Sequence, residues 1–524
     1  MDSTTTPQPT PQPTPQSTPQ PTPQPTPQPH LSSGSLLLVV AVACLWCGLA
    51  RLPLWHTDLW GHLAYGRWMD EHGNRTPTTE PFLHPESQTP FVATARWSQW
   101  AGFHLVRIGG TQALQILYAT LITSTTLLTV VTLFPHRSPL PTLIAATVFL
   151  GTGWQQLQII RPQLAGLFCF AALLAITHDP RPTLRRMALV AVVMAAWANL
   201  HGSFSIGCLV LGCHVVGRIM DRFDWRHPAR WRRDRILVDR LRLLALGVAT
   251  PCLATPSGLQ LPLITWRVSQ HPNLADIIEW QPLGWHQAQA RAMLLTGLLI
   301  VTLAIAARSR TGHLRPRGVA WCLLVILGLA SLRHSRMINW WAPVAGLVAG
   351  QLAGQLSSGA SRSSFSRVSL LAGRSVALVA VLVAAACTPA VRSLLSDRDT
   401  MIARRPDVSN ATPIEVTSWL TDHPPRGTVL AAFEWGDFLI WQGPPDTRLF
   451  VASHAHLVPE AAWRDYIEII GVASDWASRL DDHDIQLLVL DRQRQADLIT
   501  ALSHHPGWQQ VYSDELASAW SRKQ

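Results

Sequence analysis

Polar and ionisable side chains recur at the ends of long apolar segments of this sequence. Asp58 and His62 follow the first such segment and are four positions apart, so a helix would place both on one face. A carboxylate and an imidazole that share a face suit a general base with its orienting partner, or two ligands of one cation. Polar residues at the ends of other segments are Glu80, Arg161, Asn199, His201, Glu279, Arg333 and His334. We expect these chain-distant side chains to converge on one site.

Simpler roles are open for each of these residues. Asp58 also suits the N-cap of a short helix, and a single Arg or His suits an anchor at a membrane surface. Tryptophans gather at the same segment ends, as is typical of an aromatic belt or of a groove that stacks against sugar rings or isoprenoid chains. They are Trp55, Trp60, Trp68, Trp97, Trp100, Trp197, Trp280, Trp285, Trp340 and Trp341. The whole polar set, rather than any one member, favours a functional cleft.

The elements that must position these residues have the composition of membrane spans. Of 524 residues, 48% are hydrophobic and only 14% charged, which is too little charge to coat soluble domains of this total size. A soluble enzyme is therefore not expected. Apolar stretches of spanning or near-spanning length occupy residues 35–54, 111–134, 139–154, 163–177, 184–200, 203–219, 241–255, 291–307, 318–333, 337–355 and 370–391. They predict an α-helical polytopic membrane protein with about eleven transmembrane helices.

The arginines give this arrangement an orientation. The net charge of +10 comes almost wholly from Arg, which clusters in loops that fall on one side when the spans are numbered this way. These loops cover residues 181–186, 218–242, 308–317 and 362–367. By the positive-inside rule that side is the cytoplasm, so the N-terminus is inside and the polar segment ends lie outside. We expect a multi-pass protein of the inner (cytoplasmic) membrane whose basic loops contact anionic membrane lipid, with no nucleic acid partner.

The two ends of the chain differ from the apolar middle. Residues 1–33 are rich in Pro, Gln and Thr, which predicts a disordered tail before a transmembrane domain at 34–396. From 397 to 524 the composition is that of a soluble domain. Expected helices there are 412–421 and 460–470, and expected strands are 428–433, 448–453, 485–491 and 508–512. This alternation predicts a small C-terminal α/β domain on the extracytoplasmic side. The eight cysteines all precede residue 424, so no disulfide framework is expected in it.

Several short motifs occur in an order that resembles a known family. They are Asp58-Leu59-Trp60-Gly61-His62-Leu63, Tyr65-Gly66-Arg67-Trp68, Arg161-Pro162, Trp197-Ala198-Asn199-Leu200-His201-Gly202, Ile278-Glu279-Trp280 and Ser331-Leu332-Arg333-His334. In this order they resemble a bacterial family of multispanning proteins in the GT-C glycosyltransferase superfamily, relatives of the protein O-mannosyltransferases. The resemblance covers roughly residues 36–350. The stretch Glu434-Trp435-Gly436-Asp437-Phe438-Leu439 is also similar to the outer domain of that family, but Ala452-Ser453-His454 departs from the Asp-x-Arg-like ending expected there.

The resemblance implies a membrane glycosyltransferase of the hexosyl-transferring, inverting kind. Its donor would be a polyprenyl-phosphate-linked sugar, and its acceptor a glycan, lipid or protein on the outer side. In the superfamily an Asp just past the first helix is the catalytic acid residue, and Asp58 occupies the matching position; Glu80 matches a second acidic residue. Arg161 or Arg333 would neutralise the leaving lipid phosphate, and a divalent cation held by Asp58 and Glu80 would share that charge work. The alternative is a non-catalytic GT-C-like membrane protein that binds a lipid-linked glycan or assembles with partners.

Overall fold

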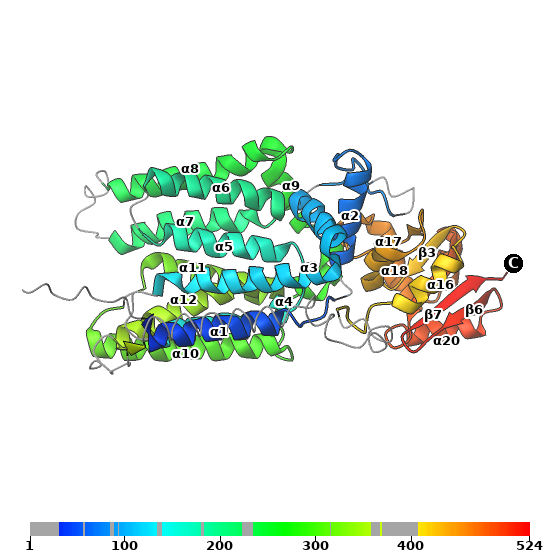
Figure 1. Cartoon of the computed structure of the whole chain (residues 1–524). Coiled ribbons are helices and arrows are strands. Elements are labelled where there is room, and N and C mark those ends of the chain that lie inside the picture. The colour runs from blue at the N-terminus through cyan, green and yellow to red at the C-terminus, as the bar shows by residue number, and fades with distance from the viewer. Residues whose placement is uncertain are drawn as a thin grey trace, which may run out of the picture.

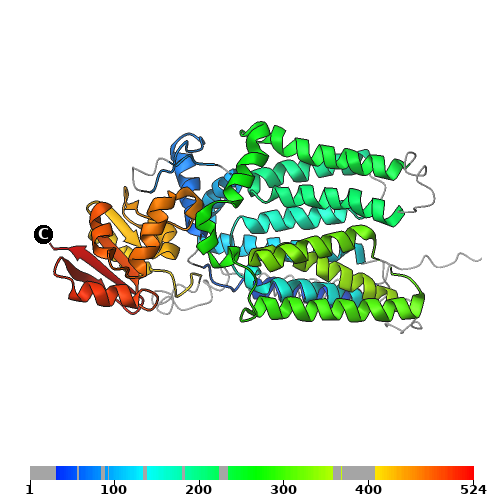
Figure 2. The ribbon, with the colours of Figure 1, turned by 180° about the vertical axis from the view of Figure 1, so that it is seen from behind.

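The computed structural model describes residues 31–55, 58–83, 89–92, 94–133, 139–179, 183–222, 234–314, 316–357, 367–368 and 407–523. They form a long helical bundle with a C-terminal domain of helices and strands at one end (Figures 1 and 2). This confirms a mostly helical protein with a small C-terminal sheet domain. The predicted tail lies outside the described residues except at its end, where β1 (Leu31–Ser32) pairs antiparallel with β2 (Arg367–Val368). The predicted span at 370–391 also lies outside them.

Long helices run side by side through the described part of the bundle (Figure 1). They are α1 (Ser33–Leu49), α3 (Arg96–Val130), α4 (Leu140–Leu157), α5 (Gln163–Thr177), α6 (Leu184–Leu200), α7 (Phe204–Arg222), α8 (Arg235–Ala254), α10 (Ala288–Thr311), α11 (Gly318–Arg333) and α12 (Ile338–Ser357). Each contains or overlaps one of the first ten predicted apolar segments. Within the described ranges, three helices are suited by length and composition to crossing a membrane, namely Arg96–Leu133, Phe204–Arg222 and Ala288–Thr311. The total of eleven spans stays a prediction.

Small residues let the bundle helices approach closely. Gly346 and Gly350 lie one turn apart on α12, and a Cβ atom on Gly346 would come within 2.5 Å of the backbone oxygen of Ala145 on α4. Close backbone approach at small residues is typical of helix packing in membranes, where lipid gives no hydrophobic driving force between helices. Thr152 of α4 and Thr296 of α10 also share a buried 2.8 Å hydrogen bond. Packing at small residues and buried polar pairs therefore hold these helices in register.

The segment after α1 folds into two helical pieces at the end of the bundle that carries the C-terminal domain. The first is α2 (Leu59–Glu71). The second is the first part of α3, which is separated from the rest of α3 by a break at Gly109 and Gly110. Gly110 has φ of 63°, a left-handed conformation that glycine adopts at little cost. The break gives the early part of α3 its own direction, and it packs beside α2 (Figure 1).

The C-terminal domain contains a five-stranded sheet with the order β4-β3-β5-β7-β6. β4 (Arg448–Leu449), β3 (Thr428–Ala431) and β5 (Ile485–Asp491) are parallel, while β7 (Ala517–Arg522) and β6 (Trp508–Ser513) are antiparallel. Its longer helices are α16 (Ile414–Asp422), α17 (Gly436–Gln442), α18 (Glu460–Ile470), α19 (Trp476–Asp482) and α20 (Ala496–His504). The predicted helices and strands are all found. The sequence interpretation missed β7, α17, α19 and α20.

The C-terminal domain is joined to the bundle mainly through α2. The guanidinium group of Arg67 on α2 donates to the carbonyl oxygens of Ile440 and Trp441, at 2.8 and 2.9 Å, and so caps the end of α17. Trp60 packs edge to face against Phe438, with ring centroids 5.2 Å apart. These contacts turn the carboxyl ends of the parallel strands β3 and β4 toward α2.

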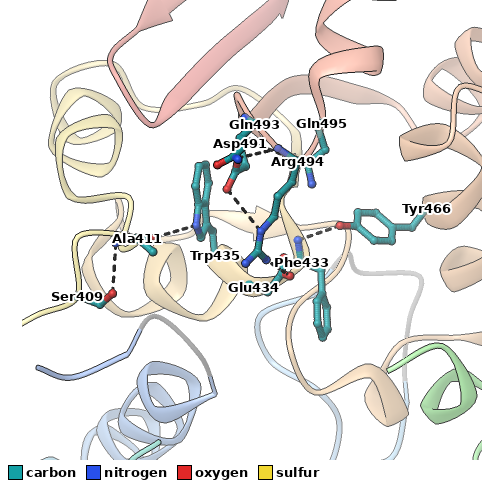
Figure 3. A network of polar contacts seen from close by, with 10 residues as sticks. All are labelled: Ser409, Ala411, Phe433, Glu434, Trp435, Tyr466, Asp491, Gln493, Arg494 and Gln495. Carbon is teal, nitrogen blue, oxygen red and sulfur yellow. Dashed lines mark hydrogen bonds and ion pairs between the residues drawn. The ribbon is translucent and has the colours of Figure 1, made fainter. Parts of the chain in front are cut away.

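A polar network fixes the turn between β3 and α17 (Figure 3). Glu434 in this turn forms an ion pair with Arg494, whose Nε lies 4.0 Å from Asp491 at the end of β5. Phe433 donates its backbone N–H to the Tyr466 hydroxyl at 2.8 Å. Neighbouring Trp435 donates its indole N–H to the Ala411 carbonyl. The direction in which α17 leaves the sheet is therefore set on both sides of the turn.

Candidate functional site

Three residues from separate parts of the chain form a partly buried ion cluster where the bundle meets the C-terminal domain. Asp58 is the residue before α2, Arg161 lies between α4 and α5, and Glu279 lies in a short 3-10 turn, η6 (Ile278–Trp280). Arg161 donates to both carboxylate oxygens of Glu279, at 2.6 and 2.7 Å. Its Nε lies 3.5 Å from Oδ1 of Asp58. The guanidinium group thus bridges two carboxylates, one of which holds it in the bidentate geometry that Arg favours.

The electrostatics of this cluster keep its ion pairs charged. Burial opposes the charge of Arg161, but Asp58 and Glu279 together raise the pKa of Arg161 above its ordinary value. Burial would raise the pKa of Glu279, yet Arg161 outweighs it and holds the pKa of Glu279 below its ordinary value. Both groups therefore stay ionised at neutral pH.

Asp58 occupies the N-cap position of α2 without acting as a side-chain cap. Its carboxylate accepts no hydrogen bond from the first turn, and its Oδ1 is buried without a hydrogen-bond partner. A capping Asp accepts from a backbone N–H two or three positions on, which stabilises the helix. Oδ1 faces the Arg161 guanidinium, so the carboxylate serves the ion cluster rather than the helix end.

A second arginine of this site is Arg336, which sequence reasoning missed. It lies in the turn η7 (Ser335–Met337), and its guanidinium stacks 4.5 Å from the ring centre of Trp280. Burial lowers the pKa of Arg336, while Glu279 and Asp58 act to raise it and Arg161 to lower it, which places all four groups in one field. The guanidinium makes no hydrogen bond or ion pair with any described residue. Two arginines and two carboxylates thus meet here, and the donors of Arg336 remain unused.

Arg333 and His334 lie just before this turn and have different surroundings. Arg333 ends α11 with an exposed side chain, and it forms no ion pair with the cluster within the described ranges. His334 has its Nδ1 at 2.7 Å from the carbonyl oxygen of Trp280, so it holds η6 against η7. The sequence signal for Arg336 was its place three positions past the end of the predicted helix 318–333. No local pattern reveals the direction of the turn on which it lies.

Histidines surround the ion cluster on the side of the C-terminal domain. The ring of His62 on α2 meets that of His454 edge to face, with centroids 4.8 Å apart, and His456 lies 6.0 Å from His454. Burial lowers the pKa of His62 and brings the pKa of both His201 and His456 to about 3. His201 accepts the backbone N–H of Ser203 at its Nδ1, so its neutral ring carries the proton on Nε2. The rings of His62, His201 and His456 are therefore neutral at physiological pH.

Two of the residues selected from the sequence are held by structural partners. Glu80 accepts hydrogen bonds from the hydroxyl group of Tyr65 at 2.5 Å and from the backbone N–H of Phe82 at 2.9 Å, and burial raises the pKa of Glu80. Asn199 donates to the carbonyl oxygens of Ala195 and Ala254, which ties α6 to the end of α8. Neither residue forms a direct contact with Asp58 among the described interactions.

The divalent cation that the resemblance places between Asp58 and Glu80 stays a prediction. The oxygens of Glu80 accept hydrogen bonds from Tyr65 and Phe82, while Asp58 faces Arg161. Among the described residues, no three or more His, Cys, Asp or Glu side chains are grouped as ligands of one ion. The positive group that faces Asp58 in this arrangement is the guanidinium of Arg161.

The tryptophans near the site divide into two groups. Trp60, Trp197, Trp340 and Trp341 are buried within the hydrophobic core, so an aromatic belt does not account for them. Trp97 and Trp100 are exposed and line a shallow cavity of about 510 Å³ between α2 and the start of α3. Trp97 and Trp100 therefore suit either role that the sequence left open, an aromatic belt or a groove that stacks against sugar rings or isoprenoid chains.

Comparisons with known proteins agree with the fold. No protein-family model matches the chain, and no curated protein matches it. Among solved structures, ArnT from Cupriavidus metallidurans bound to undecaprenyl phosphate shares 14% sequence identity with a TM-score of 0.52, over 94% of this chain and 98% of that one. The apo state of the same ArnT shares 15% identity with a TM-score of 0.51, over 93% and 98%. Identity this low speaks for fold alone, and the chain has the fold of ArnT over nearly its whole length.

Proposed function

We propose that this protein transfers a sugar from a polyprenyl-phosphate donor to a hydroxyl group of an acceptor, on the side of the membrane that carries the C-terminal domain. The observation that carries the proposal is the free Oδ1 of Asp58, which faces Arg161 inside the partly buried ion cluster. The fold of ArnT supports it, because one ArnT structure is bound to undecaprenyl phosphate. Buried charges at a membrane boundary that no structural role accounts for are typical of substrate sites.

The proposed reaction is an inverting displacement at the anomeric carbon. Asp58 accepts the proton of the acceptor hydroxyl as the oxygen forms its bond to that carbon. The bond between the anomeric carbon and the phosphate oxygen breaks, and its electron pair leaves with the polyprenyl phosphate. Arg161 is locked by Glu279, so it keeps its place beside Asp58 as charge moves through the site.

Arg336 is the residue we assign to the lipid phosphate. Its guanidinium is held over Trp280 by a cation–π contact, which fixes the group without using its N–H donors. Phosphate oxygens match the paired donors of a guanidinium group, and they gain negative charge as the sugar departs. Arg336 therefore takes the role that the sequence offered to Arg161 or Arg333.

Binding of undecaprenyl phosphate to the purified full-length protein tests this assignment. We expect Arg336→Gln to weaken binding roughly 10-fold or more, because a hydrogen bond to a charged group contributes about 1.5–3 kcal/mol. Arg333→Gln is the matched control, since it removes an equal charge three positions away from an exposed site. Loss of binding in Arg333→Gln alone would return the phosphate to Arg333. A wild-type protein that binds no undecaprenyl phosphate would remove the glycosyltransferase proposal.

A deletion strain separates the enzyme from a non-catalytic membrane protein of the same fold. We expect the deletion to change surface glycans and to leave a lipid-linked sugar unconsumed, because the transfer step that uses it is missing. Wild-type protein should restore both, and Asp58→Asn should restore neither. Full restoration by Asp58→Asn would favour the non-catalytic alternative, in which the site binds a lipid-linked glycan without turning it over.

A further inference from the structure

The C-terminal domain presents the carboxyl ends of its parallel strands to the ion cluster. β3 leads through the turn at Phe433–Trp435 into α17, whose second residue is Asp437, and β4 leads to Ser453 and His454. Both residues thus follow the carboxyl ends of neighbouring parallel strands. In α/β domains, ligands bind outside the carboxyl ends of the strands, where loops carry functional side chains. A ligand is therefore expected at the carboxyl end of the sheet, where Asp437 and His454 lie.

Asp437 and His454 lie close together at this end of the sheet. Asp437 is completely buried, accepts the backbone N–H of Ser453 at 3.1 Å, and also accepts the Ser453 hydroxyl. Its Oδ2 lies 3.7 Å from Nδ1 of His454, which is buried and makes no hydrogen bond. Gly61 on α2 makes room for the pair, since a Cβ atom there would lie 2.3 Å from Oδ2 of Asp437. Ser453 thus fixes the carboxylate of Asp437, and this carboxylate faces Nδ1 of His454.

His454 also packs against α2. Its ring meets those of His62 and Tyr65 edge to face, with centroids 4.8 and 5.3 Å apart. His62 has a positioning partner of its own, because the side-chain amide of Gln99 lies 3.1 Å from its Nδ1. Two imidazoles, one from each domain, therefore meet edge to face, and His62 lies one helical turn past Asp58.

We propose that the C-terminal domain completes the sugar-binding half of the site, with His454, positioned by Asp437, binding a hydroxyl group of the donor sugar together with His62. This inference rests on the proposed function and assigns the substrate half that the arginines leave open. The positive groups, Arg161 and Arg336, suit the phosphate. The histidines suit the sugar, since a neutral imidazole offers one donor and one acceptor and a hydroxyl group needs both.

The charge state of the ring cluster supports this division. Burial, helped by the neighbouring His454, lowers the pKa of His62, and burial brings the pKa of His456 to about 3. As neutral rings, His62 and His456 do not attract a phosphate, whereas Arg161 and Arg336 do. The donor therefore has a defined direction in the site, with its phosphate at the arginines and its sugar at the histidines.

Direct binding to two probes tests the assignment in the purified full-length protein. The probes are undecaprenyl phosphate and a panel of undecaprenyl-phosphate hexoses that carry glucose, mannose or galactose. For the hexose that the wild type binds best, we expect His454→Ala and Asp437→Asn to raise the dissociation constant roughly 3- to 10-fold, the value of one hydrogen bond. The dissociation constant for undecaprenyl phosphate should change less than twofold, and that retained binding shows that the variants are folded.

A second histidine–aspartate pair in the same domain provides the control. His483 Nε2 lies 2.7 Å from Oδ2 of Asp465, and neither residue contacts the cluster. His483→Ala should leave both dissociation constants unchanged. His454→Gln, which keeps a donor and an acceptor, should recover part of the affinity for the hexose lipid, whereas a purely structural role for His454 predicts no such selective recovery.

The possible results separate this inference from the proposed function. If His454→Ala weakens neither probe, or weakens both equally while His483→Ala does not, the histidine is not a sugar ligand and the inference is overturned. If the wild type binds undecaprenyl phosphate but none of the hexose lipids, the sugar-binding half is absent and the inference again fails, while the phosphate assignment stands. If the wild type binds neither probe, the proposed function falls and takes the inference with it.

Discussion

Oδ1 of Asp58 lies 3.5 Å from Nε of Arg161, and both atoms are buried without a hydrogen-bond partner. The two atoms carry opposite charge and lie just beyond hydrogen-bond distance, so a small shift of either side chain would join them in a hydrogen bond. Leaving buried polar atoms unsatisfied costs about 1–3 kcal/mol each, and such a cost is accepted mainly at functional sites. The pair is therefore the centre from which the following predictions are drawn.

Asp58→Asn should abolish transfer while leaving the protein folded. The amide has no useful basicity, and loss of a general base slows a reaction roughly 100-fold or more. The variant should still fold, because the Asp58 side chain makes no capping hydrogen bond and Arg161 keeps its bidentate pair with Glu279. Transfer from an undecaprenyl-phosphate hexose and thermal unfolding in detergent measure the two effects. Asp70→Asn on the same helix is the control, since Asp70 forms ion pairs with His104 and Arg107 at the surface.

Glu279→Gln should destabilise the protein through the charge it leaves behind. Arg161 would keep only Asp58, 3.5 Å away and without a hydrogen bond, as a counter-charge. Breaking a buried ion pair from one side costs on the order of 3 kcal/mol. The double variant Arg161→Gln/Glu279→Gln should be more stable than Glu279→Gln, because no uncompensated charge remains. Thermal unfolding of the variants gives the comparison. Equal melting temperatures for wild type and Glu279→Gln would show that this pair does not hold the cluster together.

Gly61→Ala should loosen the contact between α2 and the C-terminal domain. A methyl group there overlaps Asp437 and approaches His454, and overpacking of a tight interface costs about 1–3 kcal/mol. Limited proteolysis should then release a C-terminal fragment faster than from the wild type. Gly151→Ala provides the comparison, because that helical glycine has no atom within 4 Å of an added Cβ and should lose nothing. Equal proteolysis rates in both variants would contradict the described packing of α2.

Stability should fall as the pH drops below about 6.5. The pKa of His201 and of His456 lies near 3 in the folded protein, so the unfolded chain binds protons that the folded chain does not between those pH values. Each histidine then removes up to about 1.4 kcal/mol of stability per pH unit as the solution is acidified. Melting temperatures measured from pH 7 to 4.5 should show the decline, and His456→Gln should flatten it. A slope that His456→Gln leaves unaltered would mean that this ring is already protonated in the fold.

The C-terminal domain should lie outside the cytoplasm, as the arginine-rich loops at the opposite end of the bundle predict. Alkaline phosphatase fused after Gln524 should be active, because this reporter works only outside the cytoplasm. A fluorescent cytoplasmic reporter at the same position should be dark. The reverse pair of results would require an even number of spans.

Local sequence was enough to predict the elements of both domains. Apolar length predicted the helices of the bundle, and the strand at Ile485–Asp491 was placed at its observed bounds, because burial of a regular element leaves a periodic or continuous apolar pattern in the chain. The short strand β7 was missed because Ala517–Arg522 mixes small, polar and charged residues. It is defined instead by its pairing with β5 and β6.

Which side chains meet was decided only by tertiary structure. The sequence brought Asp58, Arg161 and Glu279 into one candidate set, since all three lie at segment ends on one predicted face. It selected Arg333 and missed Arg336, because the direction of the chain in the turn after α11 leaves no periodic pattern in the sequence. It also gave no reason to connect His454 with His62, since their contact depends on how a separate domain docks on α2, and docking is a property of two complementary surfaces rather than of either stretch of sequence.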